Sequence, residues 1–417
     1  MSFSADEQYR SRQDGVLLTG ATGFLGMELL ARYLEHTDRP VYALVRATDQ
    51  GMAARRLRRT LHCLFGADHP YGERVVAVRG DITKEGLGIG RQAWQLADRV
   101  DEIVHGAATV SFDLPIAGSR AINVGGTRRM LEFAELCQAS GEGLRRFTYF
   151  STAYVAGEHG GTFSEDDLDV GQGFRNPYER SKFEAEGIVK RWRSRMPITV
   201  VRPSIVVGER DSGWTPVFNV IYWPLRAFSR GAYKVIPARA SAPVDVVSVD
   251  YVADAAFALS QAPHAVGATL NLSAGRHVSS VGELVEMART LFARPAPRLI
   301  EPEFYRRVVH PVIVRASRDE RQRQALRRSE IFFPYFNARV HYDDRRTRAL
   351  LHGSGIEPSP LWEYFDRLIS FAMAAEWGKR ELPRSGLGVG RPPAHRRLPE
   401  VGPEQWLWGR SQQPLFA

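Results

Sequence analysis

The stretch from Val16 to His36 constrains the fold more than any other part of the chain. A short strand, VLLT at 16–19, runs into GATGFLG, and MELLARYLEH then repeats apolar residues at helical spacing. A glycine turn between a strand and a helix lets the backbone approach a pyrophosphate, and the first amides of the helix are free to bind it. Three glycines alone would fit an ordinary tight turn, but this context predicts a dinucleotide site. The residues expected to contact the cofactor here are Gly20, Thr22, Gly23, Phe24, Leu25 and Gly26.

The same alternation of strand and helix continues to about residue 205. Further strands are expected at VYALVR, VVAVRGD, EIVHGAA, FTYFST and ITVVRPS, separated by segments of helical spacing such as AARRLRRTLHCLF and VGGTRRMLEFAELC. These strands are apolar nearly throughout, which is typical of a parallel sheet covered on both faces. The pattern predicts an α/β fold, a Rossmann-type doubly wound parallel sheet, followed by a smaller and mostly helical C-terminal substrate-binding part.

The ends of the predicted strands supply further cofactor contacts, because ligands of open parallel sheets bind at the carboxyl ends of the strands. Arg46 ends the second strand, where an acidic residue would hold a ribose 2′-hydroxyl, and an arginine there favours the 2′-phosphate of NADPH. Arg56, in the following helix, is either a second clamp on that phosphate or an exposed surface arginine. The remaining expected contacts at strand ends are Asp81, Ile82, Ala107, Ala108, Thr109, Ser151, Pro203, Ser204 and Ile205.

The segment NPYERSKFEAE places Tyr178 four residues before Lys182, so the two side chains share one face of a helix. Thr152, at the end of the strand FTYFST, is expected at the same edge of the sheet. A nearby lysine charge would stabilise the phenolate and lower the pKa of Tyr178. These patterns predict that Tyr178 donates a proton as hydride arrives, that Lys182 also holds the ribose, and that Thr152 hydrogen-bonds the substrate oxygen. Tyr178 and Lys182 are therefore both catalytic and cofactor-binding candidates.

Charge and cysteine content limit which classes of partner and which cell compartment are expected. The formal net charge of +9 comes mainly from arginine, which suits phosphorylated ligands, an acidic protein partner or a peripheral contact with an anionic membrane surface. No zinc-finger, helix-turn-helix or RNA-stacking motif is present, so we expect no nucleic-acid partner, and no metal is expected. Two cysteines, Cys63 and Cys137, are too few for a disulfide framework. With no apolar signal core or membrane-length run, the chain is predicted to be cytoplasmic.

Together the motifs TGATGFLG, NPYERSKFEAE and VRPSIVVG, with the Thr152, Tyr178 and Lys182 set, resemble the extended short-chain dehydrogenase/reductase superfamily. Finer features, LVRA followed by ARRL, GDIT with GLGI, HGAATVSFD, INVGGT and FSTAYVAG, are similar to the branch of fatty acyl-CoA reductases and of the thioester reductase domains of carboxylic acid reductases and peptide or polyketide synthetases. The resemblance covers residues 14 to about 275. It implies NADPH-dependent reduction of an acyl-CoA or an acyl carrier protein thioester to an aldehyde or alcohol.

Residue composition suggests how the chain is divided. We expect an N-terminal extension at 1–13, an NADP-binding Rossmann domain at 14–275 with a substrate-lid insertion at about 210–245, and a mostly helical substrate domain at 276–381. A tail at 382–417 is rich in Pro, Gly and Arg and is expected to be poorly ordered. The aromatic segment 214–228 is either an apolar channel or lid for an acyl chain or ordinary packing between domains.

Other functions on the same scaffold stay open from the sequence. Dehydrogenation of a sterol or alcohol, reduction of a ketone, and nucleotide-sugar epimerisation use the same Tyr and Lys pair, although Arg46 counts against an NAD-dependent epimerase. A dinucleotide sensor without catalysis would more commonly lose the tyrosine or lysine. A structural role is the simpler interpretation of His105, Asn123 and Arg202, and no pattern specifies an oligomeric state.

Overall fold

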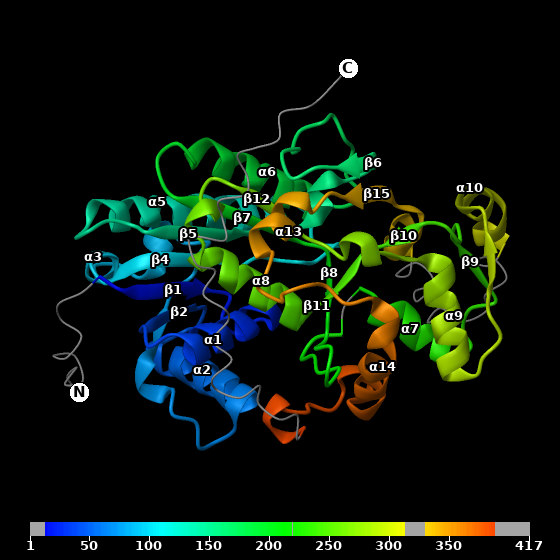
Figure 1. Cartoon of the computed structure of the whole chain (residues 1–417), viewed down its shortest axis with the longest axis horizontal. Coiled ribbons are helices and arrows are strands. Elements are labelled where there is room, and N and C mark those ends of the chain that lie inside the picture. The colour runs from blue at the N-terminus through cyan, green and yellow to red at the C-terminus, as the bar shows by residue number, and fades with distance from the viewer. Residues whose placement is uncertain (1–12, 219, 313–329, 388–417) are drawn as a thin grey trace.

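The computed structural model describes residues 13–218, 220–312 and 330–387, and Figure 1 shows the chain built around one central sheet. Seven parallel strands form this sheet in the order β12-β7-β5-β4-β1-β2-β3. Every residue of β1, β2 and β5 is buried, as expected for strands covered on both faces. The strands are β1 (Gly15–Thr19), β2 (Val41–Val45), β3 (Val75–Arg79), β4 (Val100–His105), β5 (Arg146–Phe150), β7 (Ile198–Pro203) and β12 (Thr269–Leu272).

Helices cover both faces of the sheet (Figure 1). One face carries α1 (Phe24–His36), α2 (Gln50–Phe65) and α8 (Val249–Gln261), and its apolar side chains form one core with the strands. The other face carries α3 (Gln92–Ala97), α5 (Gly125–Ala139) and α6 (Pro177–Trp192), which build a second core. The predicted Rossmann-type doubly wound sheet is thus confirmed.

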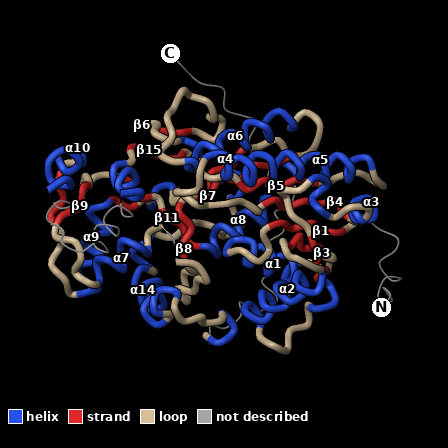
Figure 2. The backbone as a smooth tube through the Cα atoms, turned by 180° about the vertical axis from the view of Figure 1, so that it is seen from behind, coloured by secondary structure: helices blue, strands red, loops and turns tan. Residues whose placement is uncertain are grey.

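A third apolar core lies beside the sheet in the part of the molecule that holds α7, α9 and α14, which Figure 2 shows from behind. Segments far apart in sequence meet there, because β14 pairs with β9 and β13 pairs with β10. Elsewhere β15 pairs with β6 and β11 with β8. The short strands are β6 (Gly160–Phe163), β8 (Ile205–Val207), β9 (Val235–Pro237), β10 (Pro243–Val244), β11 (Val246–Ser248), β13 (Ser279–Ser280), β14 (Arg298–Ile300) and β15 (Arg339–Tyr342). The helices not yet given are α4 (Ile116–Ser119), α7 (Tyr222–Ser229), α9 (Val281–Phe292), α10 (Pro302–Phe304), α13 (Arg345–Leu351) and α14 (Phe365–Ala374).

The expectation of poor order from residue 382 onward is wrong for its first residues. Leu382 accepts a hydrogen bond from the indole N–H of the fully buried Trp214 at 3.0 Å, and Arg384 pairs with Glu209 at 2.5 Å. Glu209 is almost completely buried and needs a cation, which composition alone does not reveal. The rest of the predicted tail and nearly all of the predicted N-terminal extension lie outside the described residues. Within the described ranges, no helix is both long and apolar enough to cross a bilayer.

Candidate active site

The glycine turn between β1 and α1 has the geometry of an anion site. Gly20 has a φ of +82°, and a Cβ at Gly26 would lie 2.0 Å from the Gly20 carbonyl oxygen, so a side chain is excluded there. The Gly23 N–H donates to the Gly20 carbonyl at 2.8 Å and closes the turn. Helix α1 begins at Phe24 without a capping side chain and without an acidic residue in its first turn. Its positive end is therefore open toward the turn, with Thr22 and Leu25 beside it.

Two arginines stand next to this turn, at the end of β2. Arg46 directly follows the strand and is exposed. The Arg56 guanidinium donates to the Arg46 carbonyl oxygen and, at 3.3 Å, to the Thr22 hydroxyl. Neither arginine forms an ion pair with any residue that the structure describes. Arg56 thus lies between the glycine turn and the end of β2, where a second phosphate clamp would have to be.

The next two strand ends lie along the same edge of the sheet. After β3, the Asp81 carboxylate accepts the N–H and hydroxyl of Thr83 at 2.9 and 2.8 Å, and Ile82 is buried against α5 so closely that Gly126 has no room for a side chain. After β4, the Ala107 N–H donates to the Thr19 hydroxyl at 3.1 Å. Ala108 is exposed beside it.

Asn123 connects the β4 end to helix α6. Its amide oxygen accepts the Thr109 N–H at 2.8 Å, and its amide nitrogen donates to the Ser181 hydroxyl at 2.9 Å. Asn123 lies in a π-helical segment, Arg120–Val124, which directly precedes α5. The expected structural role of Asn123 is therefore visible as a link that orders the helix carrying Tyr178.

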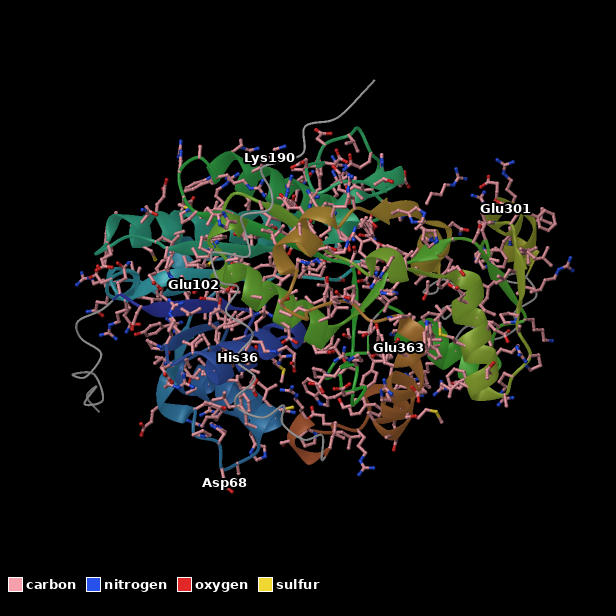
Figure 3. The ribbon with its side chains drawn as sticks, in the orientation of Figure 1. His36, Asp68, Glu102, Lys190, Glu301 and Glu363 are labelled. Carbon is pink, nitrogen blue, oxygen red and sulfur yellow. The ribbon has the colours of Figure 1, made fainter. Side chains whose placement is uncertain are left out.

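Helix α6 starts at a well-defined position, because the Asn176 side chain accepts the Glu179 N–H at 3.0 Å and Pro177 occupies the first turn. Tyr178 stands at its N-terminus, close enough to Thr152 for the Thr152 hydroxyl to act on the pKa of the phenol. The Thr152 hydroxyl also lies 3.4 Å from the Pro203 carbonyl oxygen. Lys190, three turns further on, points outward from the same helix (Figure 3). The predicted Thr152 and Tyr178 pair is thus brought together at the carboxyl edge of the sheet.

Lys182 lies beneath Tyr178, with its ammonium group directed into the protein. It donates to the Phe150 carbonyl oxygen at 2.6 Å and to the Tyr149 hydroxyl at 3.0 Å. Burial lowers the pKa of Lys182 to about 7, against an opposing effect of Glu186. Burial also raises the pKa of Tyr178 to about 12, although the Thr152 hydrogen bond acts in the other direction. The expected lowering of the Tyr178 pKa by Lys182 is therefore not found, since the lysine is bonded to Tyr149 and burial dominates.

A buried polar chain continues from Lys182 below the strand ends. The His105 ring nitrogens lie 2.8 Å from the Thr19 hydroxyl and 3.3 Å from the Thr127 hydroxyl, and Thr127 is also hydrogen-bonded to Tyr149. Burial lowers the pKa of His105 to about 3, so the ring is neutral at physiological pH. This supports the structural interpretation of His105.

The Ser151 hydroxyl is engaged by the protein itself. It donates to Glu186 at 2.5 Å, and Glu186 pairs with Arg202 at 2.5 Å. Arg202 is the structural charge that we expected, and the Ser151 side chain is directed to this ion pair. The Ser204 N–H donates to the Leu272 carbonyl at 3.1 Å, and Ile205 begins β8.

Aromatic rings that the sequence interpretation left unassigned cover Tyr178. The Phe112 ring centroid lies 5.8 Å from that of Tyr178 and 5.3 Å from that of Tyr335, which stacks on it. Tyr335 also meets Tyr154 edge-on at 5.1 Å and donates its hydroxyl to Glu179 at 2.7 Å. The signals were the tyrosine of FSTAY and the PYF motif at 334–336, but nothing in the sequence joined them to Tyr178.

An apolar cavity of about 40 Å³ adjoins these rings. Part of the aromatic segment 214–228 faces it, through Val220, Ile221 and Pro224, whereas Trp214 is packed against Leu382. Trp214 thus fits the packing alternative, whereas an acyl channel or lid stays a prediction for the residues that line the cavity. Asn219 lies outside the described residues. The lining residues are Tyr154, Ile205, Val220, Ile221, Pro224, Pro243, Val244, Asp245, Leu284, Tyr335, Phe336, Ala338, Val340 and Tyr342.

Fold and site together define an NAD(P)-binding oxidoreductase of the extended short-chain dehydrogenase/reductase class. The sequence profile described as male sterility protein matches residues 18–256, and the chain belongs to this family of acyl and thioester reductases. This confirms the resemblance seen in the motifs.

Individual relatives agree with this assignment. The chain is 32% identical over 263 residues to the L-2-aminoadipate reductase large subunit of Eremothecium gossypii, covering 59% of this chain but only 19% of that protein. It is 24% identical over 357 residues to an Arabidopsis thaliana protein named probable fatty acyl-CoA reductase 5, covering 68% and 71%. The crystal structure of the terminal R domain from the myxalamid PKS-NRPS biosynthetic pathway superposes with a TM-score of 0.75 at 25% identity, covering 88% of this chain and 92% of that one. The chain thus spans less than a fifth of the first relative and nearly all of the R domain.

Proposed function

We propose that this protein is an NADPH-dependent reductase that converts acyl thioesters to aldehydes and, by a second reduction, to alcohols. The observation that carries the proposal is that Thr152, Tyr178 and the buried Lys182 lie together at the sheet edge that also holds the glycine turn. This arrangement presents a proton donor beside a dinucleotide site and next to an apolar cavity.

NADPH fits the residues present better than NADH does. The turn is closed so tightly that Gly26 has no room for a side chain, and the open N-terminus of α1 suits a pyrophosphate. Arg46 and Arg56, which lack carboxylate partners among the described residues, would hold the 2′-phosphate. When bound, NADPH supplies the hydride.

Tyr178 would supply the proton. Because burial raises its pKa to about 12, the phenol is protonated at neutral pH, which is the state that a proton donor needs. As the thioester carbonyl becomes tetrahedral, Tyr178 donates its proton to the developing oxyanion and Thr152 holds the phenol in place. Lys182, whose pKa is lowered to about 7, would return a proton to Tyr178 and hold the ribose. Collapse of the resulting thiohemiacetal then expels the thiol and leaves the aldehyde.

A covalent route through a cysteine has little support. Cys137 is fully buried, and burial raises the pKa of its thiol to about 12. Cys63 lies in α2, and burial raises its thiol pKa as well. A neutral thiol is a poor nucleophile, so direct hydride attack on the thioester is the simpler mechanism.

We infer that the thioester is presented on the phosphopantetheine of a carrier protein, with acyl-CoA as the second form. The likeness to an R domain of a PKS-NRPS pathway supports the carrier form, and the relative named fatty acyl-CoA reductase supports the CoA form. We further propose that residues 14–275 bind NADP, that residues 276–381 bind the substrate, and that the enzyme acts in the cytoplasm.

The test is NADPH oxidation by the purified protein with acyl-pantetheine, acyl-CoA and acyl-carrier thioesters, combined with chemical trapping of aldehyde and titration of released thiol. We expect one thiol and one aldehyde per NADPH in the first reduction. NADPH binding with no turnover of any thioester, but with reduction of a ketone or oxidation of an alcohol, would refute thioester reduction and favour the other functions of this scaffold.

A further inference from the structure

The cavity next to Tyr178 contains a single acidic side chain in an otherwise apolar and aromatic lining. Tyr154, Tyr335, Phe336 and Tyr342 contribute aromatic rings, and among the described residues Asp245 is the only lining side chain that is an acid or a base other than tyrosine. Tyr154 and Tyr335 are the rings that connect the cavity to Phe112 and thereby to Tyr178. Two packed rings, Tyr335 and Phe112, therefore link the wall of the cavity to the proposed proton donor.

Asp245 is held firmly but has no cation beside it. It lies between β10 and β11, and its carboxylate accepts the Ala274 N–H at 2.8 Å. No ion pair involves Asp245 among the residues that the structure describes; hydrogen bonding from Ser204 and from the Ala274 N–H favours its charged form, and the like charge of Asp344 opposes it. Asp344 is itself paired with Arg348 at 2.9 Å. The field at this end of the cavity is thus negative, and a carboxylate without a cation costs free energy unless a ligand compensates it.

Aromatic rings and a carboxylate around one small space are the groups that recognise an alkylated ammonium ion. The rings attract the cation through their π faces, and the carboxylate neutralises the charge without requiring a hydrogen-bond donor. An entirely apolar acyl chain would instead leave the charge of Asp245 without a cation. We propose that the cavity receives the distal end of the acyl group and that Asp245, with Tyr154 and Tyr342, selects acyl thioesters whose distal end carries an ammonium group. This inference rests on the proposed thioester reduction, for which it names the substrate class.

The state of Asp245 is consistent with this role. Burial raises the pKa of Asp245 to about 6, so the carboxyl group is mostly ionised at neutral pH. Burial and then the Asp245 charge raise the pKa of Tyr342, which places that phenol in the field of the carboxylate. A cation entering the cavity would relieve the repulsion between Asp245 and Asp344.

The experiment compares two pantetheine thioesters of equal chain length, one ending in trimethylammonium and the other in tert-butyl, which has the same shape without the charge. We expect the wild-type kcat/KM to favour the cationic thioester by about tenfold or more, given the strength of a desolvated cation in an aromatic site. In Asp245→Asn, which keeps the acceptor for the Ala274 N–H, the preference should fall to about twofold or less. NADPH affinity should be retained, because Asp245 lies outside the proposed dinucleotide site.

Two further variants test whether the preference for the cationic thioester depends on the residues that line the cavity. Tyr342→Leu should also reduce the cationic preference, whereas Asp344→Asn, which removes a neighbouring carboxylate outside the lining, should retain most of it. Equal kcat/KM for the two thioesters in the wild type, a preference for tert-butyl, or a cationic preference that survives Asp245→Asn would overturn the proposal. If neither thioester is reduced while NADPH still binds, the proposed function fails. Calorimetry with the matched thioether analogues then tests whether the cavity prefers a cationic ligand. Tighter binding of the cationic analogue, lost in Asp245→Asn, supports the proposed preference, and equal binding of the two analogues overturns it.

Discussion

Charged side chains near the two ends of the central sheet differ in how they are paired. Toward the amino ends of the strands, Glu102 is completely buried in β4 and is bonded to Arg39, to Arg145 at 2.9 Å and to the Tyr33 hydroxyl at 2.5 Å (Figure 3). Asp101 completes this network with both arginines. Glu102, Asp101 and the two arginines of this network thus all have partners of opposite charge within the protein.

At the carboxyl ends Arg202 pairs with Glu186 at 2.5 Å, but several other charged groups have only neutral partners or no ion pair among the described residues. Lys182 is bonded to a phenol and a carbonyl group, Arg46 and Arg56 have no carboxylate partner in the described part of the chain, and Asp245 faces a cavity. Leaving charges uncompensated costs folding free energy, and the cost is tolerated where a bound ligand supplies the opposite charge. The comparison indicates that the amino end stabilises the fold and that the carboxyl end carries out the chemistry.

The largest effect is expected at the carboxyl end. Tyr178→Phe removes the proposed proton donor and should lower kcat by about 100- to 10,000-fold, the usual contribution of a positioned acid. NADPH affinity, measured by fluorescence titration, should change little. Tyr364→Phe is the matched control, because it removes a buried hydroxyl without a hydrogen-bond partner in the C-terminal core. Full activity of Tyr178→Phe on the true thioester would contradict the catalytic assignment.

At the amino end, Glu102→Gln should instead lower the free energy of unfolding by about 3–5 kcal/mol, since it breaks a buried ion pair and leaves Arg39 partly uncompensated. Urea unfolding measures this loss, and kcat of the folded variant should stay near that of the wild type. Glu135→Gln, which removes an exposed carboxylate 3.7 Å from Arg195, should cost less than about 1 kcal/mol. A large loss of kcat with unchanged stability in Glu102→Gln would contradict the inference that the amino end serves stability and the carboxyl end serves catalysis.

The sequence predicts those structural features that depend on local patterns of residues. The sheet follows from runs of apolar residues and helical spacing, which are local patterns. The glycine turn, Arg46, and the placement of Thr152, Tyr178 and Lys182 at one edge follow equally, because a strand end and a four-residue helical spacing fix where side chains lie. Whether these residues act as proposed is a matter for the experiments above.

The remaining features depend on contacts between distant segments. Tyr335 reaches Tyr178 from 157 positions further along the chain, through Phe112, and no periodic pattern marks it. Asp245 sits in a short connection between two minor strands. The partner of Lys182 is Tyr149, which the strand pattern marks only as buried, so the sequence suggested Tyr178 instead. Residues 382–387 pack because a distant buried carboxylate attracts Arg384, which composition does not record.

The pH dependence of stability tests whether Lys182, at the carboxyl end of the sheet, is a buried lysine without a carboxylate partner. Its folded pKa, about 7, lies below the ordinary lysine value, so above pH 7 the unfolded chain binds a proton that the folded protein does not. Stability from this group therefore rises with pH above 7, by at most about 1.4 kcal/mol per pH unit, and is constant below 7. Lys182→Met should remove that rise in urea unfolding between pH 6 and 9. Lys190→Met, on the exposed face of the same helix, should leave the profile parallel to that of the wild type. Parallel profiles for both variants would mean that Lys182 does not titrate as a buried, unpaired lysine.

The smallest effect, about tenfold, concerns the arginines at the end of β2. Arg56→Ala should weaken NADPH binding by about this factor, because a hydrogen bond to a charged group contributes roughly 1.5 kcal/mol or more, and should leave NADH binding unchanged. Arg58→Ala removes an exposed arginine of the same helix and should change neither affinity, which separates a local contact from the overall positive charge. An equal loss for NADPH and NADH would mean that Arg56 supports the turn at Thr22 without touching the 2′-phosphate. Arg56 would then have a structural role, like the charged residues at the amino end. The difference between the two ends of the sheet would not hold at this position.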